Sequence, residues 1–307
     1  MKRILIITFF LSVTTLAGAQ TLSGTYRFAQ RDTCDLFLDI YEPAAVDGPA
    51  RPSVLFVFGG GFILGRRDDP YCLPWFKRLT DKGFRVISID YRLGLKGVRM
   101  RFDPLHLIDA ADKAKHAVDI GVEDVFSAIL FLADHAEELG VDIDNIVIAG
   151  SSAGAMISLS SEWEICNGTP RTAVLPTGFN FAGVMSFAGA VMSTTGQPDY
   201  PLTPCPQLLI HGTADGAVAY DKTAFGRRGM YGSSALAKIL SQKGFVYNIY
   251  RFKDHSHDMA ANFIATWPEQ IRFLEENVMG KSGRIIDAMI DDPAVPVMLN
   301  ITLDDIY

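Results

Sequence analysis

The sequence predicts an α/β protein with a mostly parallel, doubly wound sheet, and two observations support this fold class. Short apolar runs alternate with helical patterns along most of the chain, and these runs lack the polar alternation of half-exposed strands. Strands that alternate with helices form parallel sheets whose faces the helices cover. Because 49% of the 307 residues are apolar, the chain has enough material for one large core, and we expect one domain.

The residue pattern predicts eight strands and five flanking helices. Two short runs separated by a polar turn predict a leading β-hairpin, at 26–30 and 36–41. Six buried strands are expected after it, at 53–58, 84–89, 146–149, 181–187, 207–210 and 246–252. Helical patterns lie at 73–82, 122–139, 153–162, 233–243 and 259–278. Segment 94–121 falls outside the alternation and is expected to be an excursion over one rim of the sheet.

The chain starts with the composition of a secretory signal peptide, at residues 1–19. A basic start precedes the apolar stretch 4–13, and small residues precede the expected cleavage after Ala19. The apolar stretch is too short to span a bilayer, and no later segment is uniformly apolar over about twenty residues. We therefore expect a secreted or periplasmic protein without a membrane span. The α/β domain should occupy 20–280, followed by a tail at 281–307 to which no function is assigned.

The charge of the chain excludes one class of partner. The formal net charge is −7, and removal of Lys2 and Arg3 with the signal peptide makes it more negative. Nucleic acid is bound by clustered Lys and Arg, and the chain has no basic run. We expect no nucleic-acid partner.

The four cysteines leave their pairing open. Export would allow disulfides, and four cysteines permit three complete pairings, among which the sequence does not choose. No two cysteines are closely spaced, which disfavours a metal site. They are Cys34, Cys72, Cys166 and Cys205.

Ser152 is the candidate nucleophile. It is the centre of Gly150-Ser151-Ser152-Ala153-Gly154, which lies directly between an apolar run and a helical pattern. A Gly-x-Ser-x-Gly motif on a strand-turn-helix presents the serine hydroxyl above the sheet, because the glycines permit a very tight turn. The alternative is an ordinary helix start rich in small residues, since the pentapeptide also occurs by chance.

A serine nucleophile needs a base and an acid to orient that base. Asp215 follows the run 207–210 at the carboxyl end of a strand, where ligands meet such sheets; Asp221 is the alternative acid. His255 and His257 both follow the last strand and compete for the role of base. A metal pair is the weaker interpretation of these two histidines, because no third ligand has suitable spacing. The remaining histidines are expected to be structural or exposed, namely His106, His116, His135 and His211.

A glycine-rich loop is the candidate oxyanion hole. Gly59-Gly60-Gly61 follows the first strand of the main sheet, and successive glycines let backbone N–H groups approach a substrate. The N–H of Ala153, directly after the nucleophile, would complete the hole. The alternative is a flexible or phosphate-binding loop, but neither the Walker nor the dinucleotide glycine pattern is present.

Together these motifs resemble an α/β-hydrolase fold carboxylesterase, similar to the carboxylesterase and hormone-sensitive-lipase-like branches. The resemblance extends over about residues 39–278 and also includes Asp90-Tyr91-Arg92-Leu93. It implies that Gly60 and Gly61 donate to the oxyanion and that His257 is the base. Two departures are that Phe58 stands where the loop often begins with histidine, and that no Gly-x-Gly precedes the base.

These observations predict a serine carboxylesterase that acts through an acyl-enzyme without a cofactor. The segment between residues 187 and 207 is short, which predicts a short lid and an open site for small acyl groups. Small-molecule or glycan-linked esters are the expected substrates, with acetyl groups on carbohydrate as the narrower expectation. The alternatives are a serine peptidase of the same fold and a hydrolase-like binding protein without catalysis.

Overall fold

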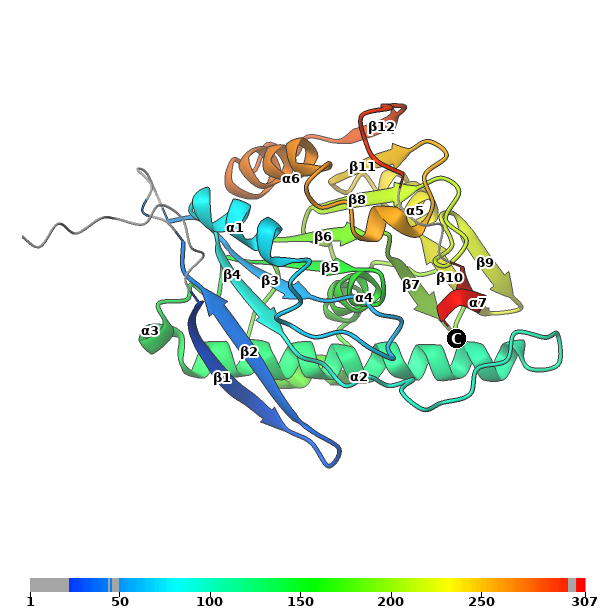
Figure 1. Ribbon diagram of the computed structural model, residues 1–307, viewed down its shortest axis with the longest axis horizontal. Helices are drawn as coiled ribbons and strands as arrows, with labels where there is room; N and C mark the ends of the chain where they lie inside the picture. Colours follow the sequence, from blue (N-terminus) through cyan, green and yellow to red (C-terminus); the bar gives the residue numbers. More distant parts are fainter. Residues whose placement is uncertain (1–21, 44, 46–49, 298–301, 307) are drawn as a thin grey trace, which may run out of the picture.

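The computed structural model describes residues 22–43, 45, 50–297 and 302–306, so the predicted signal peptide lies outside the described residues. Within these ranges a nine-stranded sheet forms the centre of the protein (Figure 1). Its strands, in spatial order, are β1 (Leu22–Gln30), β2 (Asp35–Tyr41), β4 (Arg85–Ile89), β3 (Ser53–Val57), β5 (Ile146–Ser151), β6 (Gly183–Phe187), β8 (Gln207–Gly212), β11 (Tyr247–Phe252) and β12 (Ile286–Ile290).

The pairing of these strands confirms the predicted doubly wound sheet. β1 pairs antiparallel with β2, as the predicted hairpin requires, and β2 pairs antiparallel with β4. All other neighbours in this sheet are parallel. Every residue of β3 and β6 is buried, which explains why their sequences are continuous apolar runs.

Helices cover both faces of the sheet, with α1 and α6 on the opposite side from α2 (Figure 1). Trp75 of α1 donates a 2.6 Å hydrogen bond to Gln270 of α6, which ties these two helices together. The helices are α1 (Leu73–Asp81), α2 (Leu107–Asp134), α3 (Ala136–Leu139), α4 (Ala153–Asn167), α5 (Ser233–Gln242), α6 (Trp267–Phe273) and α7 (Leu303–Ile306). Shorter turns are the 3₁₀ helices η1 (Pro170–Val174) and η2 (His257–Ala260) and the π-helical turn η3 (Leu274–Met279).

The prediction that segment 94–121 is an excursion outside the helices is wrong for its second half. Helix α2 begins at Leu107 and not near Val122. The buried side of its first turns consists of small residues, such as Ala110 and Ala117, between many charges. Alanine gives a weak amphipathic signal, so the helical period was hidden. The helix expected at 259–278 also begins late, at Trp267, with Pro268 in the first turn where proline is tolerated.

The sheet has one strand more than the eight expected. The additional strand is β12, which lies in the segment 281–307 and pairs in parallel with β11. Its residues are alternately half-buried and exposed, a weak signal for an edge strand. A second sheet of three strands also went unpredicted, with the order β7 (Ala190–Ser193), β10 (Arg228–Gly232) and β9 (Lys222–Phe225). β7 lies in the segment where a short lid was expected.

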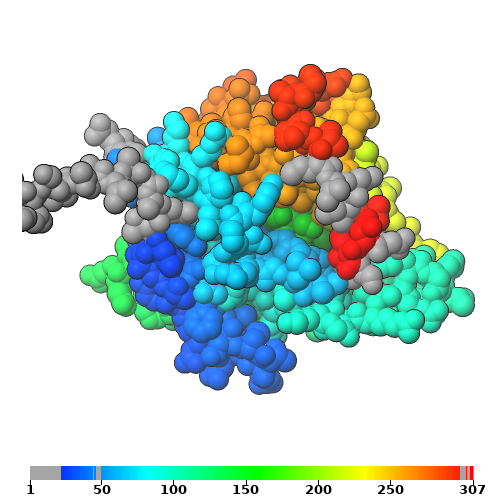
Figure 2. All heavy atoms as spheres, viewed as in Figure 1, coloured from blue at the N-terminus to red at the C-terminus, as the bar shows by residue number. Residues whose placement is uncertain are grey.

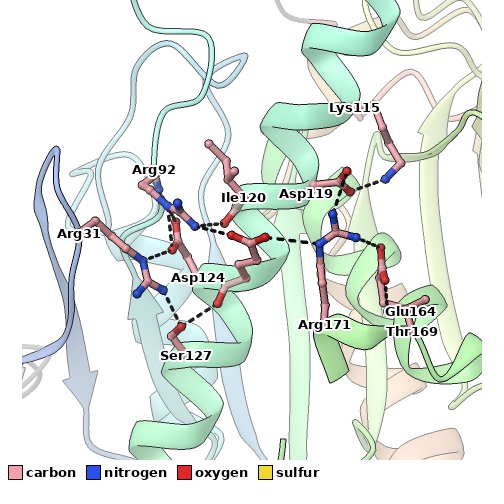
Figure 3. Close-up of polar contacts among 11 residues, drawn as sticks. Arg31, Arg92, Lys115, Asp119, Ile120, Asp124, Ser127, Glu164, Thr169 and Arg171 are labelled. Carbon is pink, nitrogen blue, oxygen red and sulfur yellow. Dashed lines mark hydrogen bonds and ion pairs between the residues drawn. The ribbon is translucent and has the colours of Figure 1, made fainter. Parts of the chain in front are cut away.

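A buried carboxylate anchors the hairpin and the end of β4 to α2 (Figure 3). Asp124 of α2 is fully buried and accepts hydrogen bonds from Arg31, which follows β1, at 3.1 Å. The Nε atom of Arg92 lies 2.9 Å from the same carboxylate, and the backbone N–H of Arg92 donates to it at 2.8 Å. The resemblance motif 90–93 therefore has a structural role at Arg92.

All four cysteines lie in the described ranges and are unpaired. Cys34 is exposed and the other three are buried.

Candidate active site

Ser152 lies on a strained turn between β5 and α4. Its φ of 51° is positive, which is unfavourable for a residue with a side chain. The flanking glycines make the turn possible: a Cβ on Gly154 would lie 2.1 Å from the carbonyl oxygen of Val57, and one on Gly150 would lie 2.2 Å from that of Gly154. The motif therefore forms the expected strand-turn-helix, and the ordinary helix start does not account for its backbone.

Ser152, His257 and Asp215 are linked by hydrogen bonds. Ser152 Oγ lies 2.7 Å from His257 Nε2, and His257 Nδ1 lies 2.8 Å from Asp215 Oδ2. A carboxylate only accepts hydrogen bonds, so Nδ1 carries the proton and Nε2 is left to accept the serine hydroxyl. The three side chains come from the ends of β5, β8 and β11, which the parallel sheet brings to one edge.

The carboxylate of Asp215 is held in place from both sides. Oδ1 accepts backbone N–H groups of Ala217 and Val218, both at 2.9 Å, and its side chain is fully buried. Oδ2 accepts from His257 and, at 3.1 Å, from His211. Burial acts to raise the pKa of Asp215, but hydrogen bonds from the two histidines prevail and hold it well below its usual range. Asp215 therefore stays ionised.

The competing residues lie elsewhere. His255 Nδ1 pairs with Asp258 Oδ2 at 2.8 Å, so its imidazole is used in a separate buried pair. Asp221 forms an ion pair with Lys238 at 3.0 Å on the surface. Within the described ranges, no three or more His, Cys, Asp or Glu side chains are grouped so that they could hold a metal ion.

The glycine loop lies against the turn that carries the serine. A Cβ on Gly59 would be 3.3 Å from the Cβ of Ser152, which measures how closely the loop approaches. Gly60 and Gly61 both have positive φ, at 117° and 62°, a conformation that favours glycine. A Cβ on Gly60 would also lie 2.1 Å from the carbonyl oxygen of Leu64. Gly61 and Ala153 line the same cavity as Ser152, whereas Gly60 lies outside its lining. Because Ala153 is the first residue of α4, its N–H has no helical acceptor.

The cavity beside Ser152 has a volume of about 590 Å³ and a mainly apolar lining. Its walls come from outside the central sheet: the first turns of α2, strands β9 and β10, and Ile306 of α7. Figure 2 shows α7, in red, on the same face as the blue-green start of α2. The bulky apolar side chains that line it are Phe62, Met100, Phe102, Leu107, Ile108, Met156, Met192, Val218, Phe225, Met230 and Ile306.

The contact between His211 and Asp215 was not predicted from the sequence. His211 was expected to be structural or exposed, yet its Nε2 atom binds the same oxygen of Asp215 as His257 does. The signal was the spacing of His211 and Asp215 within one strand end, four residues apart. That spacing alone does not distinguish a partner of the acid from a core histidine.

Part of the chain matches a known protein family. A model of the carboxylesterase family matches residues 15–178, which is more than half of the chain. The chain belongs to the carboxylesterase family. The matched segment contains the glycine loop and Ser152, and it ends before Asp215 and His257. The predicted resemblance is confirmed.

Individual relatives of this chain match only in part. The non-reducing polyketide synthase Preu3 of Preussia isomera is 32% identical over 146 residues, 46% of this chain and 5% of that protein. Esterase LipI of Mycobacterium tuberculosis is 31% identical over 120 residues, 38% of this chain and 31% of its own. The aligned parts thus span less than a third of either relative.

A solved structure supports the fold over most of the chain. The thermophilic esterase Est2 of Thermogutta terrifontis, with propionate bound, aligns with a TM-score of 0.58 and 19% identity. The alignment covers 85% of this chain and 94% of that chain. The fold is therefore the α/β-hydrolase fold.

As for membranes, none of the helices in the described ranges has the length and hydropathy that a crossing requires.

Proposed function

We propose that this protein hydrolyses carboxylic esters through an acyl-enzyme. The observation that carries the proposal is the hydrogen-bonded chain of Ser152, His257 and Asp215 at the wall of an apolar cavity. A serine hydroxyl with a base at 2.7 Å and an ionised acid behind that base has the arrangement that acyl transfer requires. Membership of the carboxylesterase family supports the same reaction.

In the first half-reaction, Ser152 Oγ attacks the ester carbonyl carbon while its proton passes to His257 Nε2. The tetrahedral intermediate then expels the alcohol, which takes that proton from His257, and the acyl group remains on Ser152. In the second half-reaction a water molecule repeats the attack with His257 as base, and the acid leaves as Ser152 regains its proton. Asp215 keeps the imidazole oriented and stabilises its protonated form.

Backbone N–H groups would bind the oxyanion of both intermediates. The candidates are Gly60, Gly61 and Ala153, of which Gly61 and Ala153 line the cavity next to Ser152. Loss of one such donor costs about 3 kcal/mol of transition-state stabilisation in serine hydrolases. Because these donors belong to the backbone, the reaction does not depend on a histidine at Phe58.

The proposed substrates are short-chain acyl esters, and the cavity favours an apolar group on one side of the ester. About 590 Å³ is within the range of small-molecule sites, and the lining is dominated by methionine, phenylalanine and aliphatic side chains. The acetyl ester of a carbohydrate is the narrower form of the proposal. A sugar needs hydrogen-bond partners on the cavity wall, which Thr223 and Arg228 would supply.

The test compares the parent protein with Ser152→Ala on p-nitrophenyl acetate, butyrate and octanoate, on a feruloyl ester, and on an acetylated glycan. The parent should hydrolyse the simple esters, and Ser152→Ala should lower kcat by about 10⁴-fold or more. A fluorophosphonate probe should label the parent and not the variant. Ester hydrolysis by Ser152→Ala at the parent rate would contradict the mechanism, and cleavage of peptides without esters would favour the peptidase. Failure of the probe to label the folded parent would favour a binding protein.

We also propose export to the periplasm or the medium, on the basis of the basic start, apolar stretch and small residues of segment 1–19. The test is N-terminal sequencing of the protein recovered from a host with the secretory pathway. A mature start at Gln20 is expected, and an intact Met1 in the cytoplasm would contradict export.

A further inference from the structure

We propose that His211 is a positioning residue that extends the activity of His257 as a base to lower pH. The proposal rests on the ester hydrolysis proposed above. Its basis is that one carboxylate oxygen, Oδ2 of Asp215, lies between two imidazoles, 2.8 Å from His257 Nδ1 and 3.1 Å from His211 Nε2. His211 is fully buried at the end of β8.

The surroundings of His211 determine which ring nitrogen carries its proton. Nε2 faces two acceptors, Asp215 Oδ2 and the carbonyl oxygen of Val218 at 3.2 Å. Neither group donates a hydrogen bond, so Nε2 must carry the hydrogen. Nδ1 lies 2.8 Å from Ser233 Oγ, and in this tautomer it accepts a hydrogen bond that the hydroxyl donates. The neutral Nε2–H tautomer therefore satisfies every contact of the ring.

This donation changes how Asp215 acts on His257. A hydrogen bond from His211 draws negative charge on Oδ2 away from the bond with His257, so the carboxylate holds a protonated His257 less tightly. The neutral form of His257, which accepts the proton of Ser152, then persists to lower pH. The other oxygen, Oδ1, accepts its two backbone N–H bonds from Ala217 and Val218 and none from His211.

Other charged groups near His211 have partners of their own. The ring of Tyr220 contacts His211 edge-on at 5.7 Å, and Arg251 of β11 is its neighbour in the strand register. The guanidinium of Arg251 binds Tyr220 Oη at 2.6 Å and Asp287 at 2.6 Å. The titratable groups that these contacts bring to His211 are Asp215, Tyr220 and Arg251, with His257 on the far side of Asp215 Oδ2. The turn η2 also contains the buried Asp258, which pairs with His255. On its other side, β6 contributes the uncharged Phe187 beside Ile210.

The test measures kcat/KM against pH for p-nitrophenyl butyrate with the parent, His211→Met and His211→Gln. Met removes the donor, and Gln can place an amide N–H near the position of Nε2. For His211→Met we expect the acid limb to move about one pH unit higher, which lowers kcat/KM about tenfold at a fixed pH on that limb. His211→Gln should recover most of both.

His255→Gln is the matched control, because His255 also forms a buried pair with an aspartate but does not contact Asp215. It should leave the acid limb at the parent position. A parent-like profile in folded His211→Met, or equal losses in Met and Gln without movement of the limb, would overturn the proposal.

A second measurement does not depend on the folding of a variant. Nitrogen NMR of the histidine rings in the parent should show the Nε2–H tautomer for His211, and an Nδ1–H tautomer would overturn the proposal. Failure of ester hydrolysis itself is distinguishable, because it would appear as an inactive parent or an active Ser152→Ala.

Discussion

Arg228 of β10 and Asp112 of α2 form a paired contact beside the cavity, with Nε and Oδ1 2.7 Å apart and Nη2 and Oδ2 3.2 Å apart. The pair connects the second sheet to the first turns of α2, and Arg228 also lines the cavity. Both side chains are substantially exposed, at 39% and 47%. Solvent therefore screens the attraction between them.

We predict that Asp112→Asn leaves the free energy of unfolding nearly unchanged, because solvent screens exposed ion pairs and they contribute little. Urea unfolding of the parent, both single variants and the double variant with Arg228→Gln measures the coupling between the two charges. A coupling of several kcal/mol would contradict this prediction.

Asp124→Asn should have a much larger effect, a loss of about 3 kcal/mol in the free energy of unfolding. Like Asp112→Asn, it removes one negative charge from α2. The carboxylate is fully buried, and its removal leaves Arg31 and Arg92 without the charge that their hydrogen bonds require. Asp112→Asn on the same helix is the control. Equal unfolding midpoints for the two variants would show that burial does not determine how much each carboxylate contributes to stability.

Ala111→Phe should narrow the cavity and shift the preference toward short acyl groups. Ala111 lines the cavity from α2, and a phenyl ring there occupies space that a longer acyl chain would need. We expect kcat/KM for octanoate to fall about tenfold or more relative to acetate. Ala133→Phe, at the far end of the same helix, is the control and should leave the ratio unchanged. A ratio that also stays constant in Ala111→Phe would mean that the acyl chain binds elsewhere.

The ionised state of Asp215 predicts a pH dependence of stability. Its pKa is lower in the folded protein than in the unfolded chain, so the group stabilises the fold above the unfolded value, about pH 4. This stabilisation is lost as the pH falls through the folded pKa. We expect parent and Asp215→Asn to differ most in unfolding temperature at pH 5–7 and to converge below pH 4. A difference that grows as the pH falls would contradict the sign of this shift.

The central part of the fold could be predicted because its strands are buried on both faces. Such strands have continuous apolar sequences, as β3 does, and this sequence pattern is typical of strands in parallel sheets. Strand β9 could not be predicted, because all four of its residues are exposed and its sequence has no apolar face. The start of α2 was hidden for a related reason, since Ala110 and Ala117 bury too little area to mark a helical face.

The residues of the candidate site also divide into those that the sequence predicts and those that it does not. Ser152 and Asp215 could be predicted from position, since each directly follows a buried strand of the parallel sheet. The choice of His257 over His255 needed the resemblance to a family, and in the structure His257 Nε2 lies 2.7 Å from Ser152 Oγ. The contact between His211 and Asp215 depends on side-chain orientation at the end of β8, which no periodicity encodes.

The length of α2 connects the β1–β2 hairpin to a wall of the cavity. Ile108 lines the cavity near one end of the helix, and Asp124 is the attachment point of Arg31 further along it. At 1.5 Å per residue these two positions are about 24 Å apart, on one continuous helix. A change in the hairpin that tilts α2 would therefore move a cavity wall without touching any residue near Ser152. Substitutions that act on the proposed acyl site in this way would lie in parts of the chain that never contact the ester.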